Sequence, residues 1–137
     1  MQKTILLECV EKAGRSQMAE GFSRKYAPIG YEPQSAGTKP IGAINPLAIA
    51  VMREIGIDIS RQQPKTISDS MIQQSSRIVN MGCMDKESCP ALFVQNVLDW
   101  GIADPKGKSI DEIRAIRNQI GIKVKDLIKS LERQSDA

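Results

Sequence analysis

Short apolar runs alternate along this chain with segments in which apolar residues recur at helical spacing. This pattern predicts strands at Lys3 to Glu8, Tyr31 to Ala36, Arg77 to Met81 and, more weakly, Val94 to Asp99. Because helical segments separate these strands, the order predicts an α/β fold with a parallel sheet and helices on both of its faces. In such sheets the ligand site lies beyond the carboxyl ends of the strands.

The predicted helices have recognisable beginnings and ends. Gly14 and Ser16 open the helix after the first strand, and its apolar residues follow at i, i+4 and i+8: Met18, Phe22 and Tyr26. Asn45-Pro46 predicts the start of a second helix, since Asn is a good N-cap and Pro suits the first helical position. Gly56 predicts the stop of that helix. A short helix is expected near Ser68 to Gln74.

The last helix has the clearest pattern. Its start at Ser109-Ile110-Asp111-Glu112 is a capping box. One apolar stripe follows, made of Ile110, Ile113, Ile116, Ile120, Val124, Leu127 and Leu131. Gly121 interrupts this helix and should weaken it by about 1 kcal/mol relative to Ala.

Length and composition limit the kinds of protein this can be. A chain of 137 residues with 41% hydrophobic and 26% charged residues predicts a single globular domain, residues 1–137. The net charge of +3 is too small to indicate a nucleic-acid-binding protein. The apolar run Ile5 to Leu7 is too short for a secretory signal, so we expect a cytoplasmic protein with reduced thiols.

The absence of His and the low aromatic content limit the reactions that this chain can catalyse. The chain has no His, which excludes Ser-His-Asp and Cys-His catalysis and His-ligated metal sites. Aromatic residues make up 4% of the chain, too few for an aromatic cofactor pocket or a base-stacking surface. We therefore expect no metal and no bound cofactor, and chemistry that rests on Cys, Asp, Glu, Lys, Arg and backbone amides.

The loop after the first strand has the residues for such chemistry. It has the pattern C-x5-R-S and reads Cys9, Val10, Glu11, Lys12, Ala13, Gly14, Arg15, Ser16. Backbone amides of such a loop, with the following helix N-terminus, bind anions and favour a thiolate at Cys9. Arg15 can bind a tetrahedral oxyanion with two parallel hydrogen bonds, and Ser16 can donate to the thiolate. The alternative is a buried structural Cys9 with a solvated Arg15.

The sequence resembles the arsenate reductases of the low-molecular-weight tyrosine phosphatase fold. The resemblance rests on Cys9 to Phe22 and, in the family's order, on Ser35-Ala36-Gly37-Thr38, Ile44-Asn45-Pro46, Gly56 to Ser60, and Asp104-Pro105 with Gly107. It covers nearly the whole chain and implies a four-stranded parallel sheet. It also implies that Asp104 is the general acid, whereas an Asp-Pro pair alone is more often a turn.

Two further cysteines bear on whether the protein is a phosphatase or an arsenate reductase. Cys9, Arg15 and Asp104 suffice for a phosphatase, but reducing arsenate takes two electrons, which one dithiol supplies. Cys83 and Cys89 follow the third predicted strand and could supply them. They could instead be buried thiols, a poor zinc ligand pair, or a redox-sensing pair in a phosphatase.

The resemblance implies a relay of three thiols. Cys9 attacks arsenate, Cys83 attacks Cys9 and releases arsenite, and Cys89 then takes over the disulfide, which thioredoxin or a similar reductant reduces. The interval between Cys83 and Cys89 is one residue shorter than in the best-known relatives, so which of them attacks first stays open. Lys106, Gly107 and Lys108 beyond the general acid suit a small anion better than a phenyl ring.

Two residues depart from the family's pattern. Glu8 stands where an apolar residue is usual, and its carboxylate would oppose a thiolate at Cys9. Lys12 stands where the family usually has an Asn that braces the loop. In some relatives that Asn helps to hold a potassium ion, with acidic and Ser positions that match Glu20, Ser35 and Asp69. A Lys ammonium could replace the cation, so we predict no dependence on potassium.

Overall fold

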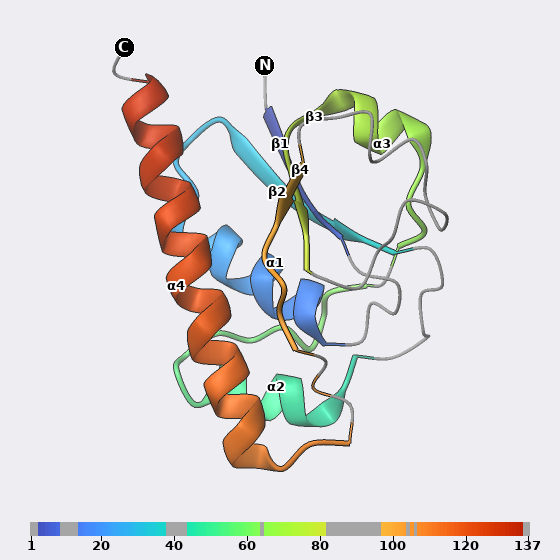
Figure 1. The fold of residues 1–137 in the computed structure, drawn as a ribbon, viewed down its shortest axis with the longest axis vertical. Helices are drawn as coiled ribbons and strands as arrows, with labels where there is room; N and C mark the ends of the chain where they lie inside the picture. Colours follow the sequence, from blue (N-terminus) through green and yellow to red (C-terminus); the bar gives the residue numbers. More distant parts are fainter. Residues whose placement is uncertain are drawn as a thin grey trace.

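The computed structural model describes residues 3–8, 14–37, 44–63, 65–81, 97–103, 105 and 107–135 of the chain. Strands and helices alternate along most of it (Figure 1). In chain order the elements are β1 (Lys3–Glu8), α1 (Arg15–Tyr26), β2 (Tyr31–Ala36), α2 (Pro46–Arg53), α3 (Asp69–Gln74), β3 (Ser75–Asn80), β4 (Val97–Asp99) and α4 (Ile110–Ser135).

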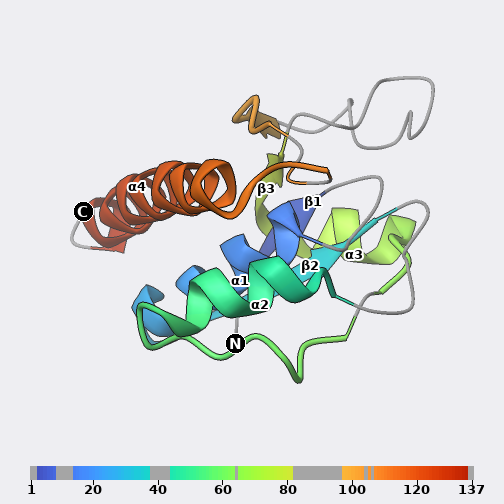
Figure 2. The same cartoon turned by 90° about the horizontal axis from the view of Figure 1, so that it is seen from below.

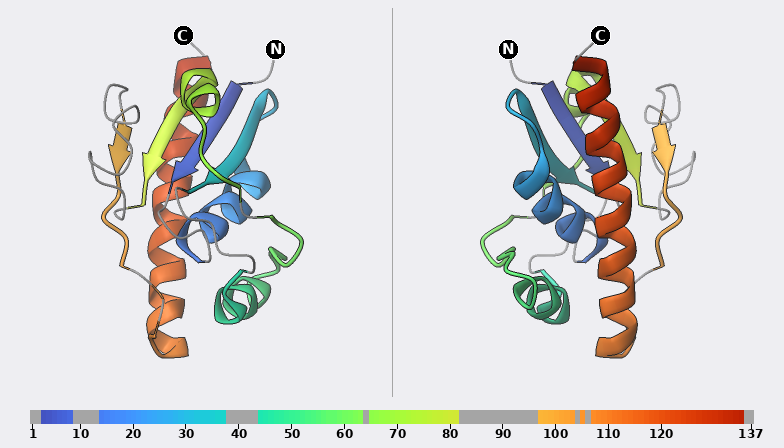
Figure 3. Two further views of the ribbon diagram at one scale, coloured as in Figure 1. Left: turned by 90° about the vertical axis from the view of Figure 1, so that its right-hand side faces the viewer. Right: turned by 90° about the vertical axis from the view of Figure 1, so that its left-hand side faces the viewer.

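The four strands form one parallel sheet in the order β2-β1-β3-β4. All four arrows point the same way in Figure 3. The central strand β1 ends at Glu8, which pairs with Ala36 of β2 on one side and Asn80 of β3 on the other. The carboxyl ends of these three strands therefore lie side by side, and the predicted fold class is confirmed.

Helices cover both faces of the sheet because alternate residues of each strand are apolar on opposite sides. Ile5 and Leu7 of β1 and Val79 of β3 belong to a core shared with α1, α2 and α4. Leu6 points to the other face, where it joins a smaller core with Ile72 of α3. Figure 2 shows α3 across the sheet from α4.

The start of β1 and the end of α4 lie at the same end of the molecule, away from the carboxyl ends of the strands (Figure 1). The start of α1 and the helix α2 lie toward the opposite end, below the sheet in that view. The loop that carries the predicted chemistry leaves the carboxyl end of β1, as expected for a site of this fold.

The predicted helix starts are confirmed by their caps. Asn45 Oδ1 accepts a hydrogen bond from Leu47 N at 2.9 Å, and Pro46 is the first residue of α2. Ser68 Oγ accepts one from Met71 N at 3.2 Å and begins α3. The helix α2 ends at Arg53, three residues before the predicted stop at Gly56, whose φ of +82° lies in the region that favours glycine.

The last helix keeps its capping box and nearly all of its stripe. Ser109 Oγ accepts from Glu112 N at 3.2 Å, and Glu112 Oε1 accepts from Ser109 N at 3.2 Å. Every residue of the stripe after the first is buried. Ile110, the first residue of α4, is the exception and is 36% exposed.

The prediction for Gly121 needs a correction. A Cβ at Gly121 would lie 2.9 Å from Phe22 Cζ, too close for two carbon atoms. The glycine therefore lets α4 approach the Phe22 ring of α1, and Ala at this position would force the ring to move. Gly121 is a packing requirement rather than only a weak point of the helix.

Two strand boundaries differ from the prediction. β3 begins at Ser75 rather than Arg77 because α3 ends directly into it, and Ser75 already has extended backbone angles and pairs with Thr4. It ends at Asn80 rather than Met81. β4 is described from Val97 to Asp99, and the first residues of the predicted strand, 94–96, lie outside the described residues.

Candidate active site

Arg15 is the first residue of α1, and its side chain is held by a segment that lies far away in the sequence. The residue is only 8% exposed, and its Nη1 donates a hydrogen bond of 2.7 Å to the carbonyl oxygen of Ile102. A guanidinium carries five N–H donors in a fixed plane, so this one bond also fixes the direction of the others. The geometry suits a group that orients a tetrahedral oxyanion.

The Ile102 peptide also connects Arg15 to the end of β3. Its N–H donates to the carbonyl oxygen of Met81 at 2.7 Å, and Trp100 N donates to Asn80 O at 2.9 Å. The backbone from Trp100 to Ile102 therefore follows the end of β3. Met81 stands two residues before Cys83 in the sequence, so the residue that leads toward the cysteine segment and Arg15 are both hydrogen-bonded to the backbone of Ile102.

Gly14 and Pro105 are in tight contact at the start of α1. Both residues are buried, and a Cβ built on Gly14 would lie only 2.7 Å from Pro105 Cγ. The φ of Gly14 is −139°, which any residue can adopt, so it is the lack of space beside Pro105 that requires glycine here. Gly14 follows Cys9 by five residues, and Pro105 directly follows Asp104.

The first turn of α1 has the features of an anion site. Gly14 at the N-cap makes no side-chain cap, and the first turn contains no acidic residue. Ser16 is fully buried, yet its Oγ has no hydrogen-bond partner in the described part of the chain. A buried hydroxyl without a partner costs free energy, so it is expected where a ligand or reactive group completes the bonding.

Behind the first turn, a chain of amide and hydroxyl groups fixes α1 against β2. Gln62 Nε2 lies 2.9 Å from Gln17 O and 2.7 Å from Gln17 Oε1. Gln17, which is fully buried, donates to Ser35 Oγ at 3.2 Å. Ser35 in turn donates from both its N and its Oγ to Glu20 Oε1, each at 2.9 Å. This set, which we call the Gln17 network, holds the helix turn that presents Arg15.

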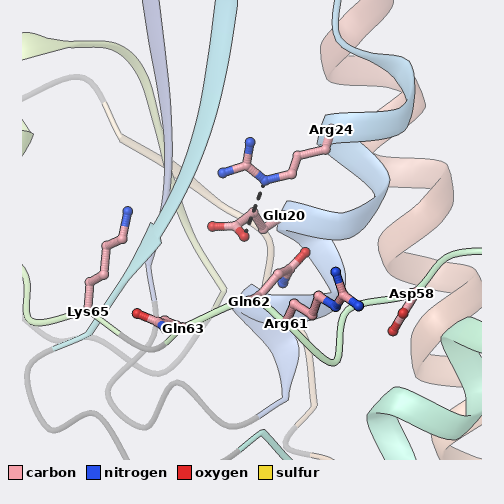
Figure 4. A pocket seen from close by; sticks show the side chains of 7 residues that line it. All are labelled: Glu20, Arg24, Asp58, Arg61, Gln62, Gln63 and Lys65. Atoms are coloured by element: carbon pink, nitrogen blue, oxygen red, sulfur yellow. Dashed lines mark hydrogen bonds and ion pairs between the residues drawn. The ribbon is translucent and has the colours of Figure 1, made fainter.

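A polar groove of about 410 Å³ opens beside the Gln17 network (Figure 4). Its lining combines three cationic residues with two carboxylates and two amides: Glu20, Arg24, Asp58, Arg61, Gln62, Gln63 and Lys65. Within it the Glu20 carboxylate is paired with Arg24 Nε at 3.4 Å. The resemblance relates Glu20 and Ser35 to a potassium site, and here Glu20 is bonded both to Ser35 and to the Arg24 guanidinium. Independence of potassium stays a prediction.

Beyond Pro105 the chain makes a tight turn into α4. Lys108 N donates to Pro105 O at 3.2 Å, and Gly107 has a φ of +74°, which favours glycine. The turn leaves Lys108 half-buried near the start of the helix. In the described part of the chain, no group of three or more Cys, Asp or Glu residues is arranged to hold a metal ion. No described helix is long and apolar enough to span a membrane.

The structure brings together Gly14, Arg15 and Ser16 of the predicted loop with Pro105 of the predicted acid segment. The other predicted site residues lie outside the described residues: Cys9, Val10, Glu11, Lys12, Ala13, Cys83, Cys89 and Asp104. Sequence reasoning missed Ile102, because it acts through its backbone and an Ile side chain gives no signal for that. It also missed Gln62, which lies just beyond the Gly56 to Ser60 match.

Comparison with known proteins matches this arrangement to one family over almost the whole chain. Residues 4–137 match the family described as low molecular weight phosphotyrosine protein phosphatase. The chain belongs to that family. Within it, the chain is 38% identical over 126 residues to arsenate reductase 2 of Staphylococcus saprophyticus, covering 90% of this chain and 95% of the relative.

Solved structures of this phosphatase family share the fold. An arsenate reductase in the phosphate-binding state superposes with a TM-score of 0.83 at 31% identity, covering 94% of this chain and 98% of that one. A thioredoxin-dependent arsenate reductase from Corynebacterium glutamicum gives a TM-score of 0.80 at 33% identity, covering 97% of this chain and 63% of that one. The resemblance to arsenate reductases of this fold is thus confirmed.

Proposed function

We propose that this enzyme reduces arsenate to arsenite with Cys9 as the nucleophile, and that residues 1–137 act as a single domain. The observation that carries the proposal is the parallel pairing of β1 with β3, in which Glu8 lies opposite Asn80. Cys9 directly follows Glu8, and Cys83 follows Asn80 by three residues. Both cysteines therefore belong to segments that leave the same edge of the sheet. Its relatives of 34–38% identity that cover nearly its whole length are named arsenate reductases.

The first step is attack of the Cys9 thiolate on arsenic. An As–S bond forms and an As–O bond breaks, and the departing oxygen leaves as water with a proton from Asp104. Val10 to Ser16 bind the oxyanion through backbone amides and the Arg15 guanidinium, and the Ser16 hydroxyl donates to the Cys9 thiolate. The bond from Arg15 to Ile102 and the contact of Gly14 with Pro105 support these roles, because they join the anion loop to the segment around Asp104.

The next steps move two electrons from sulfur to arsenic. A second thiolate, which we assign to Cys83, attacks Cys9 sulfur; the pair of electrons of the As–S bond passes to arsenic and arsenite leaves. The resulting disulfide between Cys9 and Cys83 is attacked by the Cys89 thiolate, which frees Cys9 and leaves a disulfide between Cys83 and Cys89. Each exchange conserves the number of disulfides, so one external dithiol per turnover restores the enzyme.

We propose thioredoxin or a similar redox protein as that external dithiol, and no resident cofactor or metal. One relative in the same structural family is described as thioredoxin-dependent. A cycle that ends in a protein disulfide needs a reducing compartment, so we place the protein in the cytoplasm. Phosphate should bind at the same loop, because it shares the shape and charge of arsenate.

The alternative is a low-molecular-weight protein tyrosine phosphatase that works through a phosphocysteine. The family match favours it as a second candidate, because a phosphatase needs only the anion loop and Asp104. The two activities differ in their need for Cys83 and Cys89. The arsenate reductase uses both cysteines in every turnover, and the phosphatase uses neither.

Steady-state assays of three variants separate these activities. With thioredoxin, its reductase and NADPH, the reductase proposal predicts loss of arsenate-dependent NADPH oxidation in Cys9→Ser, Cys83→Ser and Cys89→Ser. Hydrolysis of p-nitrophenyl phosphate serves as the matched assay on the same preparations. Hydrolysis that survives Cys83→Ser and Cys89→Ser, with no arsenate-dependent oxidation in the wild type, would make the protein a phosphatase.

A further inference from the structure

We infer that the contact between Gly14 and Pro105 positions the general acid, which makes Pro105 and Gly14 positioning residues for the acid step. The inference rests on the proposed function and on the role given there to Asp104. It goes beyond that role because it explains how the chain sets the place from which the proton comes. It also explains why residue 14 is glycine.

The contact is steric and leaves no spare room. The ring of Pro105 occupies the space into which a side chain at residue 14 would extend: a Cβ there would lie 2.7 Å from Cγ, 3.7 Å from Cδ and 3.9 Å from Cβ of the ring. Real Cβ atoms essentially never approach another carbon as closely as the first of these distances. Any side chain at residue 14 would therefore push the Pro105 ring away from the start of α1.

The other end of the short acid segment is fixed independently. The Ile102 carbonyl accepts from Arg15 Nη1 at 2.7 Å, and the Ile102 N–H donates to Met81 O at 2.7 Å. Asp104 thus stands between two anchored residues, two positions after Ile102 and one before Pro105. The residues that hold them belong to the anion loop and its helix: Arg15 binds Ile102, and Gly14 contacts Pro105.

A displaced ring would act on Asp104 more than on anion binding. Proline fixes its own φ and restricts the backbone of the residue before it, so a shift of the Pro105 ring is passed directly to Asp104. A misplacement of about 1 Å in a catalytic group can cost on the order of 100-fold in rate. The backbone amides and Arg15 guanidinium that bind the anion belong to α1 and its loop rather than to the Pro105 segment, so we expect displacement of the ring to change anion binding less than the acid step.

The test is a double-mutant cycle between Gly14→Ala and Asp104→Asn. The rate is read on arsenate or on p-nitrophenyl phosphate, whichever the wild type turns over. We expect Gly14→Ala to lower kcat by on the order of 10- to 100-fold, with KM and the inhibition constant of phosphate changed less than about threefold. In the Asp104→Asn background, Gly14→Ala should lower kcat by less than about twofold. If Gly14→Ala instead lowers kcat by the same factor with and without Asp104, its effect is structural and unrelated to the acid, and the inference is overturned.

Two more variants test the contact from the other side. Pro105→Ala alone should lower kcat by less than Gly14→Ala, and it too should have no effect in the Asp104→Asn background. Pro105→Ala added to Gly14→Ala should raise kcat above that of Gly14→Ala, because removal of the ring makes room for the new methyl group. Pro105→Ala keeps the inference testable even if Gly14→Ala does not fold.

The outcomes separate this inference from the proposed function. If the wild type reduces arsenate and the effects of Gly14→Ala or Pro105→Ala persist undiminished without Asp104, the inference fails and the reductase stands. If the wild type only hydrolyses aryl phosphate, the reductase fails and the cycle is still read on that substrate. If Asp104→Asn is as active as the wild type on the substrate used, the inference is overturned.

Discussion

The Nη1 atom of Arg15 lies 2.7 Å from the carbonyl oxygen of Ile102, although the two residues stand 87 positions apart in the sequence. This bond joins the helix that presents the anion loop to the segment that precedes the proposed general acid. Arg15, the proposed oxyanion ligand, is thus also a link between two parts of the site.

Arg15→Lys should lower kcat/KM for arsenate by about 100-fold or more, because a lysine can neither reproduce the planar donor set nor keep the bond to Ile102 while it binds an anion. The matched control is Arg53→Lys, which changes an exposed arginine on α2 and should leave kcat/KM within about twofold of wild type. A loss smaller than about threefold in Arg15→Lys would contradict the role given to the guanidinium.

Ser16→Ala and Ser23→Ala form a matched pair, since both remove a buried hydroxyl of α1 that has no partner in the described part of the chain. Ser23→Ala should not lower the free energy of unfolding by more than about 0.5 kcal/mol, because no hydrogen bond within the described residues is lost, whereas Ser16→Ala also removes the proposed donor to Cys9. Ser16→Ala should lower kcat for arsenate by about 10-fold or more, because a donor to the Cys9 thiolate disappears.

Ser23 lies two turns further along α1, so Ser23→Ala should keep the wild-type kcat. The free energies come from urea unfolding and the rates from the thioredoxin-coupled assay. Equal kcat values in the two serine variants would remove Ser16 from the chemistry.

Gln62→Ala should lower the free energy of unfolding by about 1–3 kcal/mol. The change removes the donor to Gln17 Oε1 and Gln17 O, and Gln17 is fully buried, so its side-chain oxygen would lose its partner. Gln73→Ala, at an exposed position of α3, is the control and should change that free energy by less than about 0.5 kcal/mol. Equal unfolding midpoints in urea for both variants would mean that the Gln17 network does not stabilise the fold.

Protonation of the Glu54 carboxylate should make the folded protein less stable in acid. Hydrogen bonds from Arg114, and next from Arg117, hold the pKa of the Glu54 carboxyl below its ordinary value. A carboxyl with a lowered pKa in the folded state stabilises the fold at pH values above its unfolded pKa, and this contribution disappears as the pH falls through the folded pKa. The free energy of unfolding should therefore fall as the pH drops below about 4.

The matched variant is Glu54→Gln, which removes this titration without removing the side chain. It should be less stable than wild type at pH 7, and the difference should shrink as the pH falls below about 4. Urea midpoints measured from pH 7 to pH 3 provide the comparison. A difference that is constant across this range would show that the ion pairs with Arg114 and Arg117 contribute nothing to stability.

Regular structure was predictable wherever it follows from local sequence. The strands Lys3–Glu8 and Tyr31–Ala36 have the predicted bounds, and the caps at Asn45, Ser68 and Ser109 are those expected from their side chains. The start of β3 was placed late because the preceding helix ends directly into the strand, and no turn residue marks the junction.

Gly14 and Gly121 show what local sequence does not contain. Gly14 indicated the start of a helix and Gly121 a weak helix, yet the structure gives both glycines the same reason, which is close approach of a ring from a distant segment: Pro105 in one case and Phe22 in the other. The link from Arg15 to Ile102 was equally hidden, because its acceptor is a backbone carbonyl. Contacts of this kind depend on the packed fold, and the type of residue does not reveal them.

The most direct test of the thiol relay is a single turnover without any other reductant. Fully reduced protein is mixed with excess arsenate, and the arsenite released and the thiols remaining are counted per chain. The relay predicts one arsenite and the loss of two of the three thiols in the wild type, and no arsenite in Cys9→Ser. Arsenate that binds without any loss of thiols, or arsenite release that continues unchanged in Cys83→Ser, would contradict it.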